Sequence, residues 1–307
     1  MITKFGTIGS VILSLLAVFG CSDKVADKSD ASTDGQVDGQ SLTDEVQSWD
    51  AGADDETPSD DAGQSDGDGQ EESIWSPTPG TSWQWQLNKT IDTSFDVDMY
   101  DIDLFDTSAS LIEQLHENGR VVICYFSAGS REDWRPDADV FPVMSIGKQL
   151  DNWPGERWID IRNQTVRRIM QARMDLAVEK KCDGVEPDNV DGYSNKSGFD
   201  LTYSDQIDYN RFLAKEAHAR GLSVGLKNDL DQVKDLLDDF DWALNEECFD
   251  YDECDMLLPF INAAKAVFQV QYGDADLADN ICPKALALDF DTLIKHVELD
   301  SWRVSCR

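Results

Sequence analysis

The sequence predicts one (β/α)8 TIM barrel over residues 75–307, preceded by a signal peptide and a disordered acidic linker. Two observations predict the barrel. Short apolar runs alternate with amphipathic stretches, and eight such runs occur over about 230 residues, a usual length for this fold. An open doubly wound sheet is the alternative, but that fold carries a glycine-rich nucleotide loop after its first strand, and "WQWQLNKTID" contains none.

The N-terminal residues have the pattern of an export signal. Residues 1–20 combine Lys4 with a glycine-interrupted apolar run, which is typical of a secretory signal peptide. The run ends in "VFGC", which resembles the lipobox of bacterial lipoproteins, so Cys21 is the expected site of lipidation and of an N-terminal membrane anchor. Simple secretion after cleavage nearby is the alternative. The expected location is therefore the bacterial cell envelope or the medium.

Residues 21–74 are expected to form a disordered tether. Residues 22–74 contain 17 Asp or Glu, two Lys and almost no large apolar side chain, so they cannot bury enough surface to offset their chain entropy. Their acidic residues lack the spacing of a calcium loop. The rest of the chain, residues 75–307, still carries 44 acidic residues against 23 Lys and Arg. This balance argues against nucleic acid as a partner and favours a cationic or neutral ligand.

Periodicity places the barrel elements. Strands are expected at the eight apolar runs, which span residues 83–87, 99–105, 120–129, 182–189, 222–229, 241–248, 266–274 and 284–290. Helices are expected where apolar residues recur at spacings of three and four, over residues 107–119, 165–181, 209–221 and 230–240. This alternation implies parallel strands whose C-terminal ends meet at one rim.

Six cysteines remain if Cys21 carries lipid, an even number that suits disulfides in an oxidising compartment. The expected pairs, one of fifteen possible connectivities, are Cys248 with Cys254, Cys282 with Cys306, and Cys124 with Cys182. A zinc site is the competing interpretation, but no CxxC occurs. The three histidines fall in helical-looking stretches far from the cysteines, at His116, His218 and His296. No metal and no cofactor are therefore expected.

Polar residues gather at the ends of the predicted strands, where barrel enzymes build their active sites. Any single one of them could be a helix cap, but six clusters converge on one rim. The residues expected to contact the substrate there are Trp85, Asp103, Asp106, Tyr125, Ser127, Glu186, Asp191, Lys227, Asn228, Asp229, Asn245, Gln269 and Tyr272.

Six segments carry a resemblance to a known family. In chain order they are "WQWQL", "YDIDLFDT", "ICYFSAGS", "DGVEPDNVDGY", "GLKND" and "NEEC", and together they resemble glycoside hydrolase family 114, the endo-α-1,4-polygalactosaminidases, over residues 80–290. The resemblance implies a barrel hydrolase acting on α-1,4-linked galactosamine polymers. It also implies a catalytic pair made of an Asp after the fourth strand and a Glu after the sixth. These carry over to Asp188 and to Glu246 or Glu247.

The chemistry of these residues agrees with that implication. Glycosidic cleavage usually takes two carboxyl groups that flank the anomeric carbon. Strand alternation places Glu186 and Asp188 on one face, with Glu186 deeper. After the sixth strand, alternation points Glu247 inward if Leu244 packs outward, whereas the family resemblance favours Glu246. Both glutamates therefore stay candidates.

Two functions from different classes follow. The first is an exported glycoside hydrolase that makes endo-cleavages in a polysaccharide, for which a cationic aminosugar polymer is the expected partner. The second is a lectin-like barrel that binds such a polymer without cutting it, since fold alone does not guarantee catalysis. The presence of both carboxylates favours the enzyme. The sequence gives no indication of the oligomeric state.

Lipidation at Cys21 makes a direct prediction. Metabolic labelling with a fatty-acid analogue is expected to mark the wild-type protein but not the Cys21→Ser variant, because only a cysteine thiol can carry the lipid. The variant is also expected to move to the soluble fraction. Equal labelling of the two proteins would contradict the lipoprotein prediction.

Overall fold

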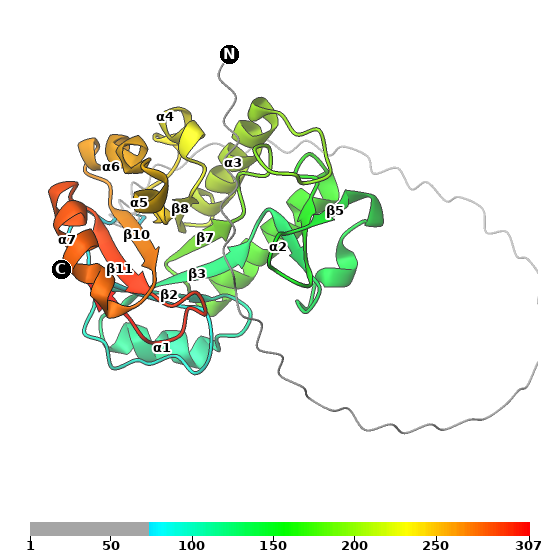
Figure 1. Ribbon diagram of the computed structural model, residues 1–307. Coiled ribbons are helices and arrows are strands. Elements are labelled where there is room, and N and C mark those ends of the chain that lie inside the picture. The colour runs from blue at the N-terminus through cyan, green and yellow to red at the C-terminus, as the bar shows by residue number, and fades with distance from the viewer. Residues whose placement is uncertain (1–73) are drawn as a thin grey trace, which may run out of the picture. The chain divides into compact units, whose positions relative to one another are not determined.

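The computed structural model describes residues 74–307, which form a curled sheet of parallel strands with helices around it (Figure 1). The predicted signal peptide, Cys21 and the linker up to residue 73 lie outside the described residues. Eight parallel strands lie side by side in chain order, as in a (β/α)8 barrel. They are β1 (Trp83–Gln86), β2 (Met99–Asp103), β3 (Val121–Ser127), β7 (Gly184–Asp188), β8 (Ser223–Lys227), β9 (Trp242–Glu246), β10 (Val267–Tyr272) and β11 (Asp291–Lys295).

Seven of the eight predicted strands are confirmed, and the eighth is wrong. Residues 284–290 lie mostly in helix α7 (Ala278–Ala287), and the strand follows at β11. The Ala and Leu residues of this stretch are strong helix formers, and the helix buries Ile281 and Ala285, four positions apart. The same error misplaced His296, which directly follows β11 and lies in no helix.

The helices follow the predicted periodicity in three of four cases. They are α1 (Ala109–Glu117), α2 (Gln164–Lys180), which Asn163 caps, and α3 (Tyr203–His218), which begins at a capping box of Thr202 and Asp205. Residues 230–240 form only a 3₁₀ turn (Leu230–Gln232) and the short α4 (Val233–Leu236). Short helices α5 (Cys248–Tyr251) and α6 (Leu258–Asn262) follow β9. None of the helices in residues 74–307 is long and apolar enough to cross a membrane.

Alternate side chains of the strands point into the barrel and out toward the helices. Trp83, Trp85, Ile123, Leu244 and Phe268 belong to one buried cluster drawn from strands all around the sheet, which is the barrel interior. Residues of the opposite parity join a larger cluster with the helices. The interior is therefore packed with aromatic and aliphatic side chains below the rim, as barrel cores are.

The C-terminal residues close the barrel between β1 and β11. Strand β12 (Val304–Ser305) pairs antiparallel with β11. On the other side, the Leu87 N–H donates to the Leu299 carbonyl at 3.0 Å, and Gln84 Nε2 donates to the Ser301 carbonyl at 2.9 Å. Residues 299–305 thus bridge the two end strands, and Trp83 Nε1 reaches across to the Asp291 carbonyl at 2.9 Å.

A small antiparallel sheet is inserted after β3, and the sequence analysis missed it. Its strands are β4 (Ser130–Glu132), β5 (Ile146–Gln149) and β6 (Glu156–Ile159), in the order β4-β6-β5. Figure 1 shows it projecting from the barrel beside α2. Arg173 of α2 fastens it, because its guanidinium donates to the Ser127 carbonyl at 2.6 Å and to Asp137 at 2.8 Å.

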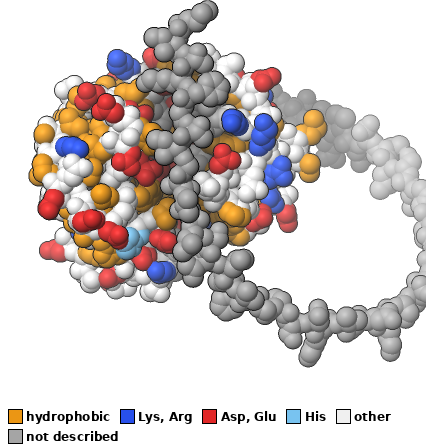
Figure 2. All heavy atoms as spheres, viewed as in Figure 1, with side chains coloured by type: hydrophobic (Ala, Val, Ile, Leu, Met, Phe, Trp, Pro, Cys, Tyr) orange, Lys and Arg blue, Asp and Glu red, His pale blue; other side chains and the backbone are white. Residues whose placement is uncertain are grey.

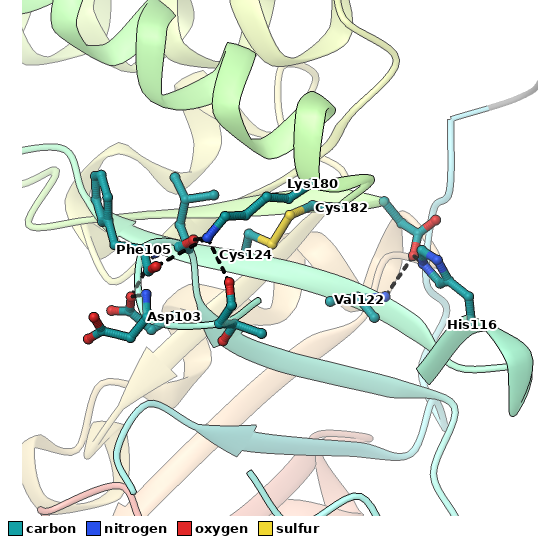
Figure 3. The surroundings of a disulfide bond; sticks show 11 residues. Asp103, Phe105, His116, Val122, Cys124, Lys180 and Cys182 are labelled. Carbon is teal, nitrogen blue, oxygen red and sulfur yellow. Dashed lines mark hydrogen bonds and ion pairs between the residues drawn. A yellow bond between two sulfur atoms is a disulfide. The ribbon is translucent and has the colours of Figure 1, made fainter. Parts of the chain in front are cut away.

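All three expected disulfides are present: Cys124–Cys182, Cys248–Cys254 and Cys282–Cys306. The first joins β3 to the turn after α2 and closes a loop of 58 residues, for which a gain of about 2–4 kcal/mol is usual. Figure 3 shows Lys180 beside this bond. Its ammonium donates to the carbonyl oxygens of Leu104 and Thr107, each at 2.6 Å, so the end of α2 is tied to the loop after β2.

Candidate active site

The site is centred on Lys227, the last residue of β8, which is only 2% exposed. Its ammonium lies 2.9 Å from Glu186 Oε1, 3.1 Å from Asp188 Oδ1 and 3.4 Å from Glu246 Oε2. It also lies 4.8 Å from the ring centre of Trp85, close enough for a cation–π interaction. One buried cation therefore joins three carboxylates at the C-terminal ends of β7 and β9, the two strands that flank β8.

Strand β7 supplies two of these carboxylates from its inward face. Glu186 and Asp188 are two residues apart, so the pleat points both toward the barrel interior, while Val185 packs among the apolar side chains facing the helices. Glu186 lies deeper and is fully buried, where Trp85 Nε1 donates to its Oε2 at 3.0 Å. The carboxylates in "GVEPDN" thus extend from the apolar interior to the rim.

Hydrogen bonds from two neighbours orient Asp188. The Tyr125 hydroxyl donates to its Oδ2 at 3.0 Å, and Asn189 Nδ2 lies 3.3 Å from the same oxygen. Asn189 has a φ of 60°, and its amide also donates to Ser127 Oγ at 3.0 Å. The Asp188 carboxylate is therefore held from both sides at the end of β7.

Glu246 is held by β10 and by the residue that follows β8. Tyr272 donates its hydroxyl proton to Glu246 Oε1, and Asn228 Nδ2 donates to Oε2 at 3.1 Å. Asn228 also accepts the Glu246 N–H at 2.9 Å, which fixes backbone and side chain together. Asn228 has a φ of 49°, a left-handed conformation that Asn tolerates better than most residues.

The structure places Glu246, not Glu247, in the Lys227 cluster. Leu244 packs inside the barrel with Trp85, so the assumption that it faces outward is wrong, and strand alternation points Glu246 inward. Glu247 lies beyond the strand with a φ of 62°. Its N–H donates to the Val270 carbonyl, and its side chain makes no contact with Lys227.

The electrostatics depend on burial opposed by Lys227. Burial raises the pKa of Glu186 to about 7 even though the ammonium of Lys227 lowers it. Burial and the neighbouring Glu186 raise the pKa of Asp101 well above its usual value. Burial alone would lower the pKa of Lys227, but Asp188, Glu186 and Glu246 raise it well above its usual value. The cluster therefore combines a lysine whose pKa is raised with two buried carboxyl groups, Glu186 and Asp101, whose pKa values are also raised.

Asp101 is the residue of this cluster that the sequence analysis missed. It is fully buried on β2, and neither of its oxygens accepts a hydrogen bond from a described donor, which agrees with a protonated carboxyl that donates to Glu186. The segment "YDIDLF" could have identified Asp101, because Asp101 and Asp103 are two residues apart on one strand and therefore face the same side.

A second acidic group, Asp191 and Asp229, lies beside Asp188. Burial raises the pKa of Asp191 to about 6, with Asp188 adding to the effect. Burial and Asp191 raise the pKa of Asp229 to about 9, and Asn210 Nδ2 donates to Asp229 at 2.8 Å. Figure 2 shows acidic side chains gathered near the middle of one face, over the strands that Figure 1 labels β7 and β10.

The remaining predicted contact residues do not contact the Lys227 ammonium. Asp103 is paired with Arg135 at 2.5 Å, and the exposed Asp106 lies 3.4 Å from the same guanidinium. Asn245 and Gln269 are buried register partners on the outward parity of β9 and β10, so they do not line the rim. Asn245 accepts from the Cys248 N–H and donates to Asn228 Oδ1 at 3.2 Å, so it supports the residue that holds Glu246, whereas Gln269 donates to the Val270 carbonyl.

Comparison with known proteins identifies the family. The model for glycoside-hydrolase family GH114 matches residues 65–307. This chain belongs to family GH114. It is similar to Ega3 of Aspergillus fumigatus, solved in complex with galactosamine, at 44% identity and a TM-score of 0.74, covering 76% of this chain and 98% of Ega3. The predicted resemblance to this family is confirmed, and the chain is a glycoside hydrolase.

A more distant structure shares only the fold with this GH114 barrel. The glycoside hydrolase domain of PelA from Pseudomonas aeruginosa superposes with a TM-score of 0.58 at 13% identity, covering 73% of this chain and 97% of that domain. No match was found among curated protein sequences.

The buried ammonium makes a prediction about stability and pH. Lys227→Met is expected to destabilise the protein by about 3–5 kcal/mol at pH 8, because it leaves buried carboxylates without a cation. At pH 5 the loss should be smaller, since Glu186 and Asp101, whose pKa values are raised, are then protonated and need no counter-ion. Urea unfolding at both pH values measures this difference.

The exposed Lys234→Met variant on α4 is the matched control, and it should lose little at either pH. An equal loss at pH 5 and pH 8 for Lys227→Met would mean that packing, rather than charge, accounts for the effect.

Proposed function

We propose that this chain is an exported endo-glycosidase that cleaves α-1,4-linked galactosamine polymers with Asp188 and Glu246 as its catalytic pair. The observation that carries the proposal is the cluster at the rim, in which both carboxylates contact the Lys227 ammonium and each accepts hydrogen bonds from its own neighbours. Two carboxyl groups held together at the C-terminal ends of barrel strands are what glycosidic cleavage requires.

The surroundings of the two carboxylates suggest their roles. We assign Asp188 as the nucleophile because it is nearer to the ammonium, at 3.1 Å against 3.4 Å for Glu246, and Tyr125 and Asn189 fix its orientation. Glu246 is farther from the ammonium and more exposed, 26% against 18% for the side chains. This position suits the general acid, which must reach the oxygen of the leaving sugar.

The spacing of the carboxylates supports retention of anomeric configuration. Lys227 Nζ lies 3.1 Å from Asp188 Oδ1 and 3.4 Å from Glu246 Oε2, so these oxygens are separated by at most the sum, about 6.5 Å. Retaining enzymes hold their carboxyl groups about 5–5.5 Å apart, and inverting enzymes about 6.5–9.5 Å. In the retaining reaction Asp188 attacks the anomeric carbon while Glu246 protonates the leaving oxygen, and water deprotonated by Glu246 then releases Asp188.

The substrate and the location are proposed from charge and from similarity. The acidic excess of the barrel residues and the buried acids beside the catalytic pair favour a polymer with free ammonium groups. Ega3, which is 44% identical to this chain, was solved in complex with galactosamine. Export, with the lipid anchor at Cys21 and the acidic linker as a spacer, rests on the N-terminal sequence pattern.

Substitution of the carboxylates tests the catalytic pair. Asp188→Asn and Glu246→Gln are each expected to lower kcat on deacetylated α-1,4-galactosamine oligomers by about a thousandfold or more, because each removes a group that acts on the reacting bond. Glu247→Gln is the matched control and should cost less than about tenfold. Reducing-end release measures turnover, and circular dichroism verifies folding. Full activity of Asp188→Asn would show that the wrong residue has been assigned.

The stereochemical prediction has a separate test. Proton NMR during the first minutes of cleavage is expected to show the α-anomer of the new reducing end before mutarotation, as a double displacement requires. The β-anomer as the first product would instead establish direct attack by water, and Asp188 would then be a general base.

A further inference from the structure

The inserted sheet carries a pair of buried carboxylates that the catalytic assignment does not use. Glu132 on β4 and Glu156 on β6 are direct register partners, so their side chains lie on the same face of the small sheet. Glu132 is 2% exposed and Glu156 is 7% exposed. Burial, followed by the charge of Glu132, raises the pKa of Glu156 to about 7. Two facing acids at this depth repel each other unless one of them is protonated or a cation joins them.

The described residues supply too little positive charge for this pair. Arg135 lies 2.8 Å from Glu132 Oε1, but its guanidinium also pairs with Asp103 at 2.5 Å and with Asp106 at 3.4 Å. Glu132 Oε2 is buried and has no hydrogen-bond partner among the described residues. Glu156 accepts only from Ser130 Oγ, at 2.9 Å, among the side chains of residues 74–307. Glu132 Oε2 is therefore a buried acceptor that remains unused by the described residues.

A chain of hydrogen bonds connects this pair to the catalytic Asp188. Ser130 Oγ, which binds Glu156, lies 2.6 Å from Ser127 Oγ. Ser127 Oγ in turn accepts a hydrogen bond from Asn189 Nδ2, and the same amide also contacts Asp188 Oδ2. The negative charges of Asp188, Glu132 and Glu156 all raise the pKa of the same Tyr125 hydroxyl. The pair therefore lies next to the reacting centre, on the side of the inserted sheet.

Two further observations narrow the ligand. No group of three or more His, Cys, Asp or Glu within residues 74–307 has the arrangement of a metal site, so a metal ion is not the expected occupant. Trp134, which is 53% exposed, lies against Gly155, because a Cβ at Gly155 would fall 2.8 Å from its ring. An exposed indole against the residue that precedes Glu156 offers an apolar face for a sugar ring.

We propose that Glu132 and Glu156 form a subsite for the ammonium group of an aminosugar unit adjacent to the cleaved bond, with Trp134 stacking on its ring. This inference rests on the proposed function and assigns specificity for free amine over N-acetyl to the inserted sheet. An ammonium carries three N–H donors on one nitrogen, so it can bind two facing carboxylates at once. The planar guanidinium of Arg135 is less suited to this role, because it already pairs with Asp103. An N-acetyl group offers a single N–H and no charge.

The test compares substrates that differ only at the nitrogen. The probes are a deacetylated α-1,4-galactosamine oligomer and its fully N-acetylated form. Glu156→Gln is expected to reduce the ratio of kcat/KM for amine over acetylated oligomer about tenfold, mainly through KM for the amine, because a charge-assisted hydrogen bond is lost. The Gln amide oxygen can still accept from Ser130, so the small sheet should stay folded. Trp134→Ala should raise KM for both probes.

The control separates this subsite from general charge attraction. Asp139→Asn removes the same charge from a fully exposed side chain of the same insertion and should leave the ratio within about twofold. A ratio unchanged by both Glu156→Gln and Glu132→Gln would overturn the proposal, as would an equal shift in the Asp139→Asn control.

If the wild type cleaves neither probe, the proposed hydrolase function is contradicted, and this result is independent of the proposed subsite. Calorimetry with the deacetylated oligomer then still tests the subsite. About tenfold weaker binding to Glu156→Gln than to the wild type would support it, and equal binding would overturn it.

Discussion

The ammonium of Lys227 is the interaction on which the arrangement of the site depends. It is almost completely buried, and it contacts carboxylates from both β7 and β9. Without it, Glu186 and Asp188 would be like charges two residues apart above an apolar interior, where ionisation is unfavourable. The lysine allows acidic groups to occupy the ends of neighbouring strands while the barrel below stays packed with Trp85 and other apolar side chains.

The barrel supplies the carboxylates around Lys227, and the insertion after β3 lies beside them. This small sheet is held through buried charge: Arg135 pairs with Glu132 and Asp103, and Arg173 bonds to the Ser127 carbonyl and Asp137. Because these links reach β2, β3 and α2 together, the insertion is an integral part of the rim. A loop in this place would not hold acids next to Asp188 with comparable order.

Closure of the barrel depends on pieces that are distant in the chain. Residues 299–305 bridge β1 and β11, and the Cys282–Cys306 disulfide fixes the residues that follow. Cys248–Cys254 fixes the turn directly after Glu246 in the same way. These two disulfides therefore lie where regular strand pairing ends and where the chain would otherwise have most freedom.

The residue pattern alone predicted the barrel, seven of its eight strands and the carboxylates of "GVEPDN", while the disulfide pairing was one choice among fifteen that the structure confirmed. These depend on local periodicity and on which residue types gather at strand ends. The eighth strand was misplaced because Ala and Leu suit helices as well as strands, and the inserted sheet has strands too short for a clear pattern. Only the tertiary structure decided between Glu246 and Glu247, because the inward position of Leu244 is set by side chains on other strands. For the same reason, only the structure showed that Asp101 lies beneath the Lys227 cluster, that Glu132 and Glu156 face each other beside it, and that Asn245 and Gln269 point out of the barrel. The environment of a side chain is made by its neighbours in space, and the spacing of residues along the chain does not contain that information.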